Sequence, residues 1–591
     1  MNDSGSEYKR IISSVCNATS GFCEFLGEQF KNSAFYSAIE RAGIKTRSID
    51  LRRKYVKKIE NTPFAKAYTS LISNMLAAST RVYGTFFLTF GLYILLVFLV
   101  KKFAFSEMGE EFGDVILACG MILAGLPIFF VDRSISMLLR TSKITNYILT
   151  KLFAVRPAML KPCEKKNVGY VAALILGLVF GSLTIFFSPL KIFMVIVVAL
   201  MIMLVLASPE SGIALLCLLL PFVDETPLLF AVCVILASLL WKVFTLKRTF
   251  HFKTIDYAVL TFALFVFVFG LLSYRQPDGL KSALTLGVFI LSYFAVTQLA
   301  VNNETFYCLI RSFLVGNLIT SLMTLLQYVS NIEYVPYSEY IVIDFVPKYS
   351  IMMVLVVALP LLLGRIQYAS SKLVAGITFL FTVAALILNE PDSYWMTALV
   401  VFFVAVFLVS KKGFLVVLFI SFASVAVCNF FLPEAVKTIV GGAFASMLEP
   451  YKVMFASNST TFTELFSGVG FGDASFKFST SELDPSIVQK PIGSLAYILS
   501  SGGIVTVMSY LFVLVGTALN TVNSLSRSNN KKMKIITKML SCSMFAMLIE
   551  SVCRNLQTGG TETLMFWLVL GLIVAGNNCL DKEDTVDVYM A

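Results

Sequence analysis

Runs of apolar residues alternate with short polar connections along most of the chain. A run of about 20 apolar residues crosses a bilayer as an α-helix. Such runs predict spans at residues 83–100, 114–131, 168–187, 189–207, 210–222, 228–245, 255–274, 281–301, 305–329, 349–365, 370–389, 393–410, 413–431, 491–521, 533–554 and 561–577. The short run 210–222 predicts either a span or a re-entrant segment. The alternating strands of a β-barrel are absent, so the pattern predicts an all-α polytopic membrane protein of about 14–16 transmembrane helices.

One polar connection is much longer than the others between the later spans. This loop, residues 432–490, contains a glycine-rich run in which Gly468, Gly470 and Gly472 alternate with larger residues. Glycine tolerates backbone angles that other residues avoid, so these three predict a tight turn over a cavity. Gly502 and Gly503, inside the following span, predict a kink or a close approach of helices. The run does not join a strand to a helix, which disfavours a nucleotide-binding loop.

Composition and charge agree with a membrane protein and suggest its orientation. Apolar residues make up 57% of the chain, charged residues 14%, and the mean hydropathy is +0.82. The net charge is +11, and the Lys and Arg residues gather in alternate connections, above all in residues 132–167. Basic connections stay in the cytoplasm, so we expect both termini inside and the loop 432–490 outside. No folded basic domain is visible, so we expect no nucleic-acid partner.

Metal and cofactor chemistry find little support in the sequence. The chain has one histidine, His251, which the predicted topology places on the cytoplasmic side. The 11 cysteines are scattered, mostly within apolar runs, without the spacing of metal ligands or of a disulfide framework. We therefore expect neither a bound metal nor a cofactor.

The pattern divides the chain into four regions. Residues 1–80 are polar and basic, without the early apolar core of a cleavable signal peptide. They predict a cytoplasmic extension, either short amphipathic helices on anionic lipid or a soluble, partly disordered tail. Residues 81–167 add two spans and a basic cytoplasmic segment. Residues 168–577 form the main transmembrane domain, and residues 578–591 a cytoplasmic tail.

Several cations at the expected outer edge of the spans run against the orientation rule. The candidates are Arg275, Lys348, Lys490 and Arg554. Charge-assisted hydrogen bonds contribute roughly 1.5–3 kcal/mol each, so two or three such groups could bind a lipid-linked pyrophosphate and stabilise it as a leaving group. The alternative explanation is snorkelling to outer headgroups, or local ion pairs.

Four short motifs follow one another along the spans and the loop. They are Leu325-Leu326-Gln327-Tyr328; Val346-Pro347-Lys348-Tyr349-Ser350 with Val357-Ala358-Leu359-Pro360-Leu361; Glu390-Pro391-Asp392-Ser393-Tyr394-Trp395; and Gly468-Val469-Gly470 with Gly502-Gly503-Ile504-Val505. In this order they resemble the O-antigen ligase and polysaccharide polymerase superfamily of membrane glycosyltransferases. The corresponding family features are a Gln-Tyr helix end, an Asn-Pro-Asn entry to a helix ending in Leu-Pro, a Ser-Arg before a span, and a large loop with its following helix. The resemblance covers roughly residues 170–577 and implies a GT-C-like fold.

The resemblance implies metal-independent glycan transfer on the outer face of a bacterial plasma (inner) membrane, in cell-surface polysaccharide biosynthesis. The donor would be a polyprenyl-pyrophosphate-linked oligosaccharide, and the acceptor a hydroxyl group of a glycan or a lipid. Membrane lipids and other polysaccharide-assembly proteins would be further partners. In the family, arginines hold the pyrophosphate, and a histidine near the start of the helix after the loop assists the acceptor hydroxyl.

Two positions depart from that family pattern. Ser393-Tyr394 stands where the family has Ser-Arg, and the run Pro491-Ile492-Gly493-Ser494 stands where it has the histidine. An active enzyme would then need a carboxylate such as Asp392 or Asp473 as its base. The expected pyrophosphate-binding residues are Lys348, Arg275, Arg554 and Lys490.

Two functions other than glycan transfer stay open. A non-catalytic relative could scaffold a polysaccharide-assembly system, which the missing arginine and histidine and the basic N-terminal extension favour. A transporter of lipid-linked sugars fits the number of spans, but few charges lie within them, which counts against it. Asn317 and Gln327, two polar residues inside one span, predict interhelical hydrogen bonds instead.

Overall fold

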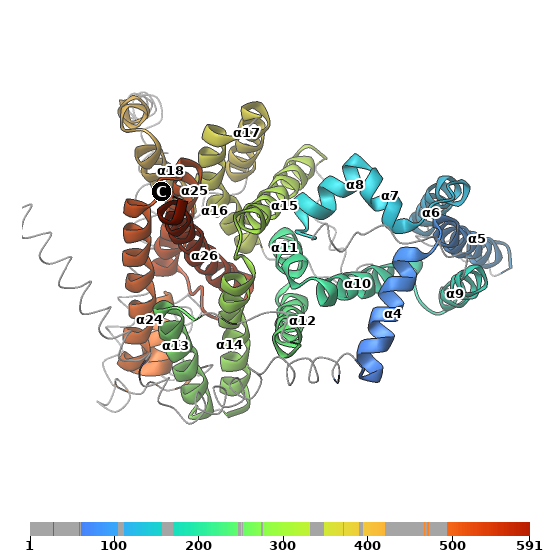
Figure 1. Cartoon of the computed structure of the whole chain (residues 1–591), viewed down its shortest axis with the longest axis horizontal. Coiled ribbons are helices and arrows are strands. Elements are labelled where there is room, and N and C mark those ends of the chain that lie inside the picture. Colours follow the sequence, from blue (N-terminus) through green and yellow to red (C-terminus); the bar gives the residue numbers. More distant parts are fainter. Residues whose placement is uncertain are drawn as a thin grey trace, which may run out of the picture.

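In the computed structural model, the described part of the chain is almost wholly helical and contains no strand (Figure 1). The structure describes residues 28, 58, 61–104, 112–155, 169–245, 250, 252–273, 276–330, 348–369, 371–388, 394–419, 466, 468, 470–471 and 493–590. For these residues the predicted all-α class is confirmed.

The helices follow the apolar runs of the sequence. The N-terminal ones are α4 (Pro63–Ala77), α5 (Thr80–Ala104), α6 (Phe112–Phe130), α7 (Ile135–Thr141), α8 (Lys143–Tyr147), the π-helix η1 (Ile148–Leu152) and α9 (Tyr170–Leu183). Then come α10 (Pro189–Ala207), α11 (Pro209–Leu219), α12 (Glu225–Phe244), α13 (Thr254–Leu271), α14 (Gln276–Leu299) and α15 (Asn303–Ser330). The last are α16 (Lys348–Tyr368), α17 (Lys372–Leu388), α18 (Tyr394–Val409), α24 (Ser494–Arg527), α25 (Lys531–Cys553) and α26 (Thr561–Met590). Ten helices in the described ranges are long and apolar enough to cross a membrane, which supports a multi-pass membrane protein.

The N-terminal helices form a unit with a small core of their own, at the right of Figure 1. Its buried residues are Phe90, Ile94, Ala118, Met121 and Ile192. Helix α9 lies close against α5, because a Cβ at Gly177 would stand 2.0 Å from Thr89 Oγ1 and one at Gly181 2.6 Å from the Tyr93 ring. Small residues four positions apart permit this close helix packing. Helix α9, which the sequence assigns to the region 168–577, therefore packs on the region before it.

The remaining helices share one large apolar core, and α26 is its most enclosed member. Of the apolar part of α26, 94% is buried inside the protein. Its Phe566 stacks on Tyr510 of α24, and its Trp567 stacks on Phe262 of α13, with ring centroids 6.0 and 5.6 Å apart. A helix that is apolar on all sides is stable when its neighbours surround it. Because its neighbours enclose α26, they also fix the positions of its two ends.

Two contacts show which helix ends lie together, and they define two groups of ends. In one group, Lys253, which precedes α13, places its Nζ 3.1 Å from Oδ2 of Asp581 in the last part of α26. In the other, Tyr394 at the start of α18 contacts Arg554, which follows α25. We call the first group the basic end and the second the carboxylate end. The grouping agrees with the alternation of connections that the basic residues predict.

A polar contact joins α15 and α17 within the apolar core. Asn317 donates a hydrogen bond from Nδ2 to Oγ1 of Thr382 at 2.8 Å, and Ser321 Oγ lies 3.4 Å from the same oxygen. All three residues are buried. The interhelical hydrogen bond predicted for Asn317 is confirmed, whereas the side chain of Gln327 lies outside the described part of the chain.

Candidate functional site

Arg554 lies at the carboxylate end in a cluster of buried polar side chains. Its guanidinium carbon is 4.7 Å from the centre of the Tyr394 ring, and its Nε is 4.0 Å from Oε2 of Glu550, one helical turn earlier. The side chain of Arg554 is 19% exposed, and that of Glu550 is fully buried. Charges withdrawn from water in this way need partners within the protein. Of the four predicted pyrophosphate-binding cations, Arg554 is the one whose side chain falls within the described residues.

Two carboxylates flank Arg554. Glu550 accepts a hydrogen bond from Oγ1 of Thr397 on α18, and Glu562, in the first turn of α26, accepts one at 3.3 Å from the Tyr394 hydroxyl. Glu562 is half-buried, whereas Glu550 and Tyr394 are enclosed. Arg554 acts electrostatically on Glu562 as well as on Glu550. With both carboxylates ionised, the two acids outweigh the one cation, so the cluster is electronegative.

The turn between α25 and α26 holds Arg554 in place. Arg554 has extended backbone angles, φ −137° and ψ 153°, which end α25. Ser494, the first residue of α24, accepts a hydrogen bond from the Leu556 N–H at 2.8 Å and donates one to the Arg554 carbonyl oxygen at 3.3 Å. Thr563 Oγ1 donates to the Leu556 carbonyl oxygen at 2.6 Å. Because protein groups satisfy these backbone atoms, the turn is stable without contact to water.

Part of the long loop packs on the first turns of α24. We call this part the glycine segment: Phe466, Gly468, Gly470 and Phe471. The Gly470 N–H donates to the Ser501 carbonyl oxygen at 2.8 Å. At Gly503, α24 leaves helical geometry with φ +67° and ψ −174°, and a Cβ there would stand 2.1 Å from the Phe466 carbonyl oxygen. The kink, one of the two alternatives predicted from Gly502 and Gly503, is present, and the backbone that approaches it closely belongs to the loop and not to another helix.

The glycine segment and the charged cluster share the start of α24. Phe471 is fully buried, and its ring meets the Tyr497 ring edge to face, with centroids 5.9 Å apart. Tyr497 follows Ser494 by less than one helical turn, and Ser494 binds the Arg554 turn. On the far side of the segment, a Cβ at Gly279 of α14 would stand 2.5 Å from the Phe471 carbonyl oxygen. The segment is therefore held between α14 and α24, next to the cluster.

The other predicted site residues are only partly covered by the structure. Lys348 is the first residue of α16, and its side chain is outside the described set. Gly502 lies in α24, where its carbonyl oxygen accepts a hydrogen bond from the Thr506 hydroxyl at 2.6 Å. The residues that lie outside the described ranges are Arg275, Asp392, Gly472, Asp473 and Lys490. The roles proposed for these five stay predictions.

Sequence reasoning missed Glu550 and Glu562 because both fall inside predicted spans. Two signals could have found them. An ionisable residue within a span is a functional candidate, and the i, i+4 spacing of Glu550 and Arg554 predicts an ion pair on one helix face. Tyr394 stands at the family's arginine position, and Ser494 ends the run Pro491-Ile492-Gly493-Ser494 at its histidine position. Both contact Arg554.

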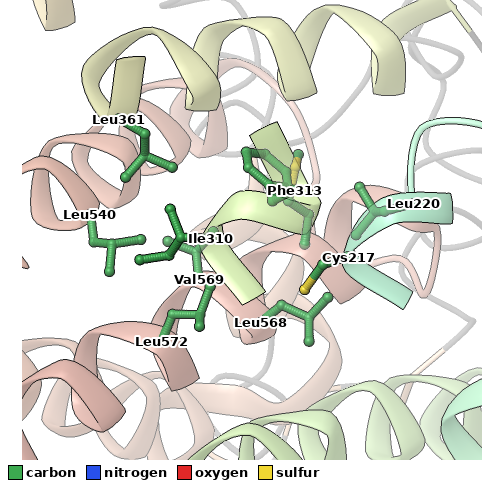
Figure 2. A pocket seen from close by; sticks show the side chains of 10 residues that line it. Cys217, Leu220, Ile310, Phe313, Leu361, Leu540, Leu568, Val569 and Leu572 are labelled. Atoms are coloured by element: carbon green, nitrogen blue, oxygen red, sulfur yellow. The ribbon is translucent and has the colours of Figure 1, made fainter. Parts of the chain in front are cut away.

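The best-formed pocket lies away from the cluster, among α11, α15, α16, α25 and α26 (Figure 2). Its cavity volume is only about 10 Å³, between side chains such as Cys217, Phe313, Leu540 and Leu568. No charged or hydrogen-bonding side chain lines it, so it offers nothing to hold or activate a polar substrate. Within the described ranges, no three or more His, Cys, Asp or Glu side chains gather to hold a metal ion. The charged cluster is therefore the best candidate site.

Comparison with known proteins adds no family assignment. No protein-family model matches the chain, and no curated protein shows significant similarity to it. The resemblance to O-antigen ligases and polysaccharide polymerases therefore rests on the four ordered motifs alone. The geometry at the carboxylate end is an independent observation, because it comes from contacts between residues.

Proposed function

We propose that the chain is a membrane-embedded glycosyltransferase that transfers or polymerises a polyprenyl-pyrophosphate-linked glycan onto a glycan or lipid acceptor. One observation carries the proposal. Tyr394, at the position where the resembling family has its arginine, contacts the Arg554 guanidinium, and Ser494, the last residue of the run that stands where the family has its histidine, binds the Arg554 backbone carbonyl oxygen. In a family whose arginine and histidine act on one substrate, these two positions have to meet. Here both lie against Arg554, Tyr394 at its side chain within the charged cluster and Ser494 at its backbone.

Glu562 is the side chain that we propose as the general base. It is half-buried, and the Tyr394 hydroxyl orients it. Its carboxylate would accept the proton of the acceptor hydroxyl while the hydroxyl oxygen bonds to the anomeric carbon of the donor sugar. The bond from that carbon to the pyrophosphate oxygen breaks, and the lipid pyrophosphate leaves with the electron pair. A positioned base of this kind typically contributes about 10²–10⁴-fold to the rate.

Glu550 and Tyr394 are proposed as positioning residues, because they hold Arg554 rather than face a substrate. The two carboxylates already offset the charge of Arg554, so Arg554 alone is a weak ligand for a pyrophosphate. The cations that would complete its binding are those predicted from the sequence: Lys348, Arg275 and Lys490. Asp392 and Asp473 stay alternatives to Glu562 as the base.

The orientation rule supports a location for this reaction. The carboxylate end would face the outside of a bacterial plasma membrane, with the basic end and both termini in the cytoplasm. The lipid-linked donor would then reach the cluster from the outer leaflet. The glycine segment, packed beside the cluster, would form part of a lid over the substrate, and other polysaccharide-assembly proteins would supply or receive the glycan.

A second candidate function is a non-catalytic scaffold of a polysaccharide-assembly system. The observation that favours it is the pairing within the cluster, where Arg554, Glu550 and Glu562 each have a partner in the protein. A fully paired ion cluster can serve specificity of folding alone. In that case the site would bind a glycan without turning it over.

The decisive experiment uses the purified full-length protein in vesicles with a polyprenyl-pyrophosphate-linked oligosaccharide. Release of the lipid pyrophosphate and growth of the glycan are both measured. We expect Glu562→Gln to lower turnover by about 100-fold or more without a matching loss of donor binding. Asp581→Asn is the matched control, because it neutralises a partly exposed carboxylate at the basic end and leaves turnover unchanged.

The outcomes separate the candidate functions. If the Glu562→Gln variant transfers glycan at the wild-type rate, Glu562 is not the base. Asp392 and Asp473 would then be tested in the same way. Donor binding with no turnover supports the scaffold. Movement of the donor across the vesicle membrane without transfer supports a transporter of lipid-linked sugars.

A further inference from the structure

An arch of short helices connects the N-terminal unit to the main body at the basic end. Helices α7 and α8 with η1 run from α6 across to α15 (Figure 1). The arch presents the basic residues Arg140, Lys143 and Lys151 together with exposed apolar side chains. Ile144 is 76% and Tyr147 56% exposed. Mixed basic and apolar exposure on a helix is typical of a segment that lies in the membrane interface.

The last turn of the arch is fixed to α15. Arg311 donates a hydrogen bond from Nη1 to the Lys151 carbonyl oxygen at 2.9 Å, and Ser312 Oγ donates to the Leu152 carbonyl oxygen. The guanidinium carbon of Arg311 lies 5.8 Å from the centre of the Tyr147 ring. These contacts place Lys151, a cation of the arch, against the first third of α15.

Further cations of α16 and α25 lie near the same part of α15. Lys532 Nζ lies 4.1 Å from the centre of the Tyr307 ring and 5.4 Å from that of Tyr368. The charge of Arg311 acts on both Lys532 and Tyr368, and that of Arg365 acts on Tyr368. We call these four cations the basic cluster: Lys151, Arg311, Arg365 and Lys532. Its members come from four separate elements, so the fold and not the local sequence brings them together.

The basic cluster carries an excess of positive charge. Its ion pair within the described residues joins Lys151 Nζ to Oε1 of Glu304 at 3.9 Å, and that carboxylate is 89% exposed. Like charges that converge repel one another, and cation–π contacts with the tyrosine rings offset this only in part. The orientation rule explains why Lys and Arg lie at this end, but it does not explain why Lys532 lies over two tyrosine rings and Arg311 near a third.

We propose that the basic cluster binds the phosphate group of an anionic phospholipid of the adjacent leaflet, with the arch lying along the membrane interface. The convergent cations match a phosphate in charge and in hydrogen-bonding capacity. The exposed side chains of Ile144 and Tyr147 beside the cluster favour a ligand that carries acyl chains over a free phosphate. Such a lipid would join the N-terminal unit, through the arch, to α15, α16 and α25. The proposal does not depend on glycan transfer.

The test measures lipid retention by the purified full-length protein in neutral detergent. The protein is given equal amounts of phosphatidylglycerol and phosphatidylcholine with the same acyl chains, and native mass spectrometry counts the lipids that stay bound. We expect one phosphatidylglycerol to be retained in preference. Lys532→Gln with Arg311→Gln should weaken its retention about tenfold or more, because each Lys or Arg near anionic lipid typically contributes a severalfold gain in affinity.

Two controls make the result specific. Arg527→Gln with Lys412→Gln removes two exposed cations from outside the cluster and should leave phosphatidylglycerol retention unchanged. Lys532→Arg keeps a cation over the tyrosine rings and should keep retention. Equal losses in the two double variants would mean that bulk surface charge attracts the lipid, and this would overturn the site.

A further arm distinguishes lipid from free phosphate. Inorganic phosphate at a concentration equal to that of the phosphatidylglycerol should not displace it. Displacement at equal concentration, or equal retention of phosphatidylcholine, would overturn the assignment to an anionic lipid. If the double variant fails to give folded protein, the preference for phosphatidylglycerol over phosphatidylcholine in the wild type, together with Lys532→Gln alone, still decides the question.

Discussion

The contact between Glu550 and Arg554 predicts an asymmetry between two substitutions. Arg554→Leu removes the cation from the fully buried Glu550 carboxylate, which keeps the hydrogen bond from Thr397. At the observed 4.0 Å, the Coulomb attraction lost is about 4 kcal/mol for an effective dielectric constant near 20. Breaking a buried pair from one side generally costs about 3–5 kcal/mol, which agrees with this figure.

Glu550→Gln should cost much less. The glutamine keeps the shape and can still accept the hydrogen bond from Thr397. Arg554, which is 19% exposed, retains the Tyr394 ring and the charge of Glu562. A loss of about 1.5–3 kcal/mol is expected, the usual value of a hydrogen bond to a charged group. Arg554→Leu should therefore be the less stable variant by about 2 kcal/mol.

Thermal unfolding of the full-length protein in one detergent ranks the variants. The expected order of midpoints is wild type, Glu550→Gln, and then Arg554→Leu. The double variant Glu550→Gln with Arg554→Leu should melt above Arg554→Leu alone, because it no longer buries a charge that has lost Arg554 as its partner. Arg527→Leu removes an exposed arginine from the end of α24 and serves as the control. If Arg554→Leu has the same melting midpoint as this control, the buried ion pair does not exist and the reasoning is refuted.

Three further predictions concern helix contacts, each measured as a shift in the melting midpoint. Gly503→Ala should lower the midpoint strongly, because φ is +67° and a Cβ would stand 2.1 Å from a carbonyl oxygen of the glycine segment. Gly516→Ala is the control and should leave the midpoint unchanged, because the nearest atom to its Cβ would be 3.5 Å away. Gly181→Leu should lower the midpoint because it separates α9 from α5. Gly120→Leu is its control and should leave the midpoint unchanged, because no atom lies within 4 Å of a Cβ at that position. Asn317→Leu should cost about 0.6–1.7 kcal/mol for its interhelical hydrogen bond, and no loss would show that the bond is not formed.

Apolar patterning predicts the helices because bilayer crossing depends on little more than length and hydropathy. The run 228–245 predicts α12 (Glu225–Phe244) within three residues, and the run 189–207 predicts α10 with the same bounds. Patterning does not predict how helices associate. The packing of α9 on α5 depends on Gly177 and Gly181, because Thr89 and Tyr93 lie directly opposite them. The sequence alone does not show which small residues have such neighbours.

The candidate site was predictable only in part, for a related reason. Arg554 stands out because a cation at the outer edge breaks a rule of charge distribution. The rule of charge distribution concerns Lys and Arg, so it does not single out Glu550 and Glu562 at the ends of their spans. They become candidate site residues because of the side chains that surround them. The proximity of Tyr394 and Ser494 to Arg554 is a tertiary property, and no local pattern contains it.

The position of the cluster on helices rather than on the loop has a mechanistic consequence. Glu550, Tyr394 and Glu562 all lie in helices or their first turns, and α26 is enclosed over 94% of its apolar part. Side chains on buried helices are held more closely than side chains on loops, so the core and not the loop sets the geometry of the charges. The glycine segment, held at the Gly503 kink, would then control access to a cluster that is already assembled. A substitution at Gly503 should therefore alter substrate binding before it alters the arrangement of the cluster.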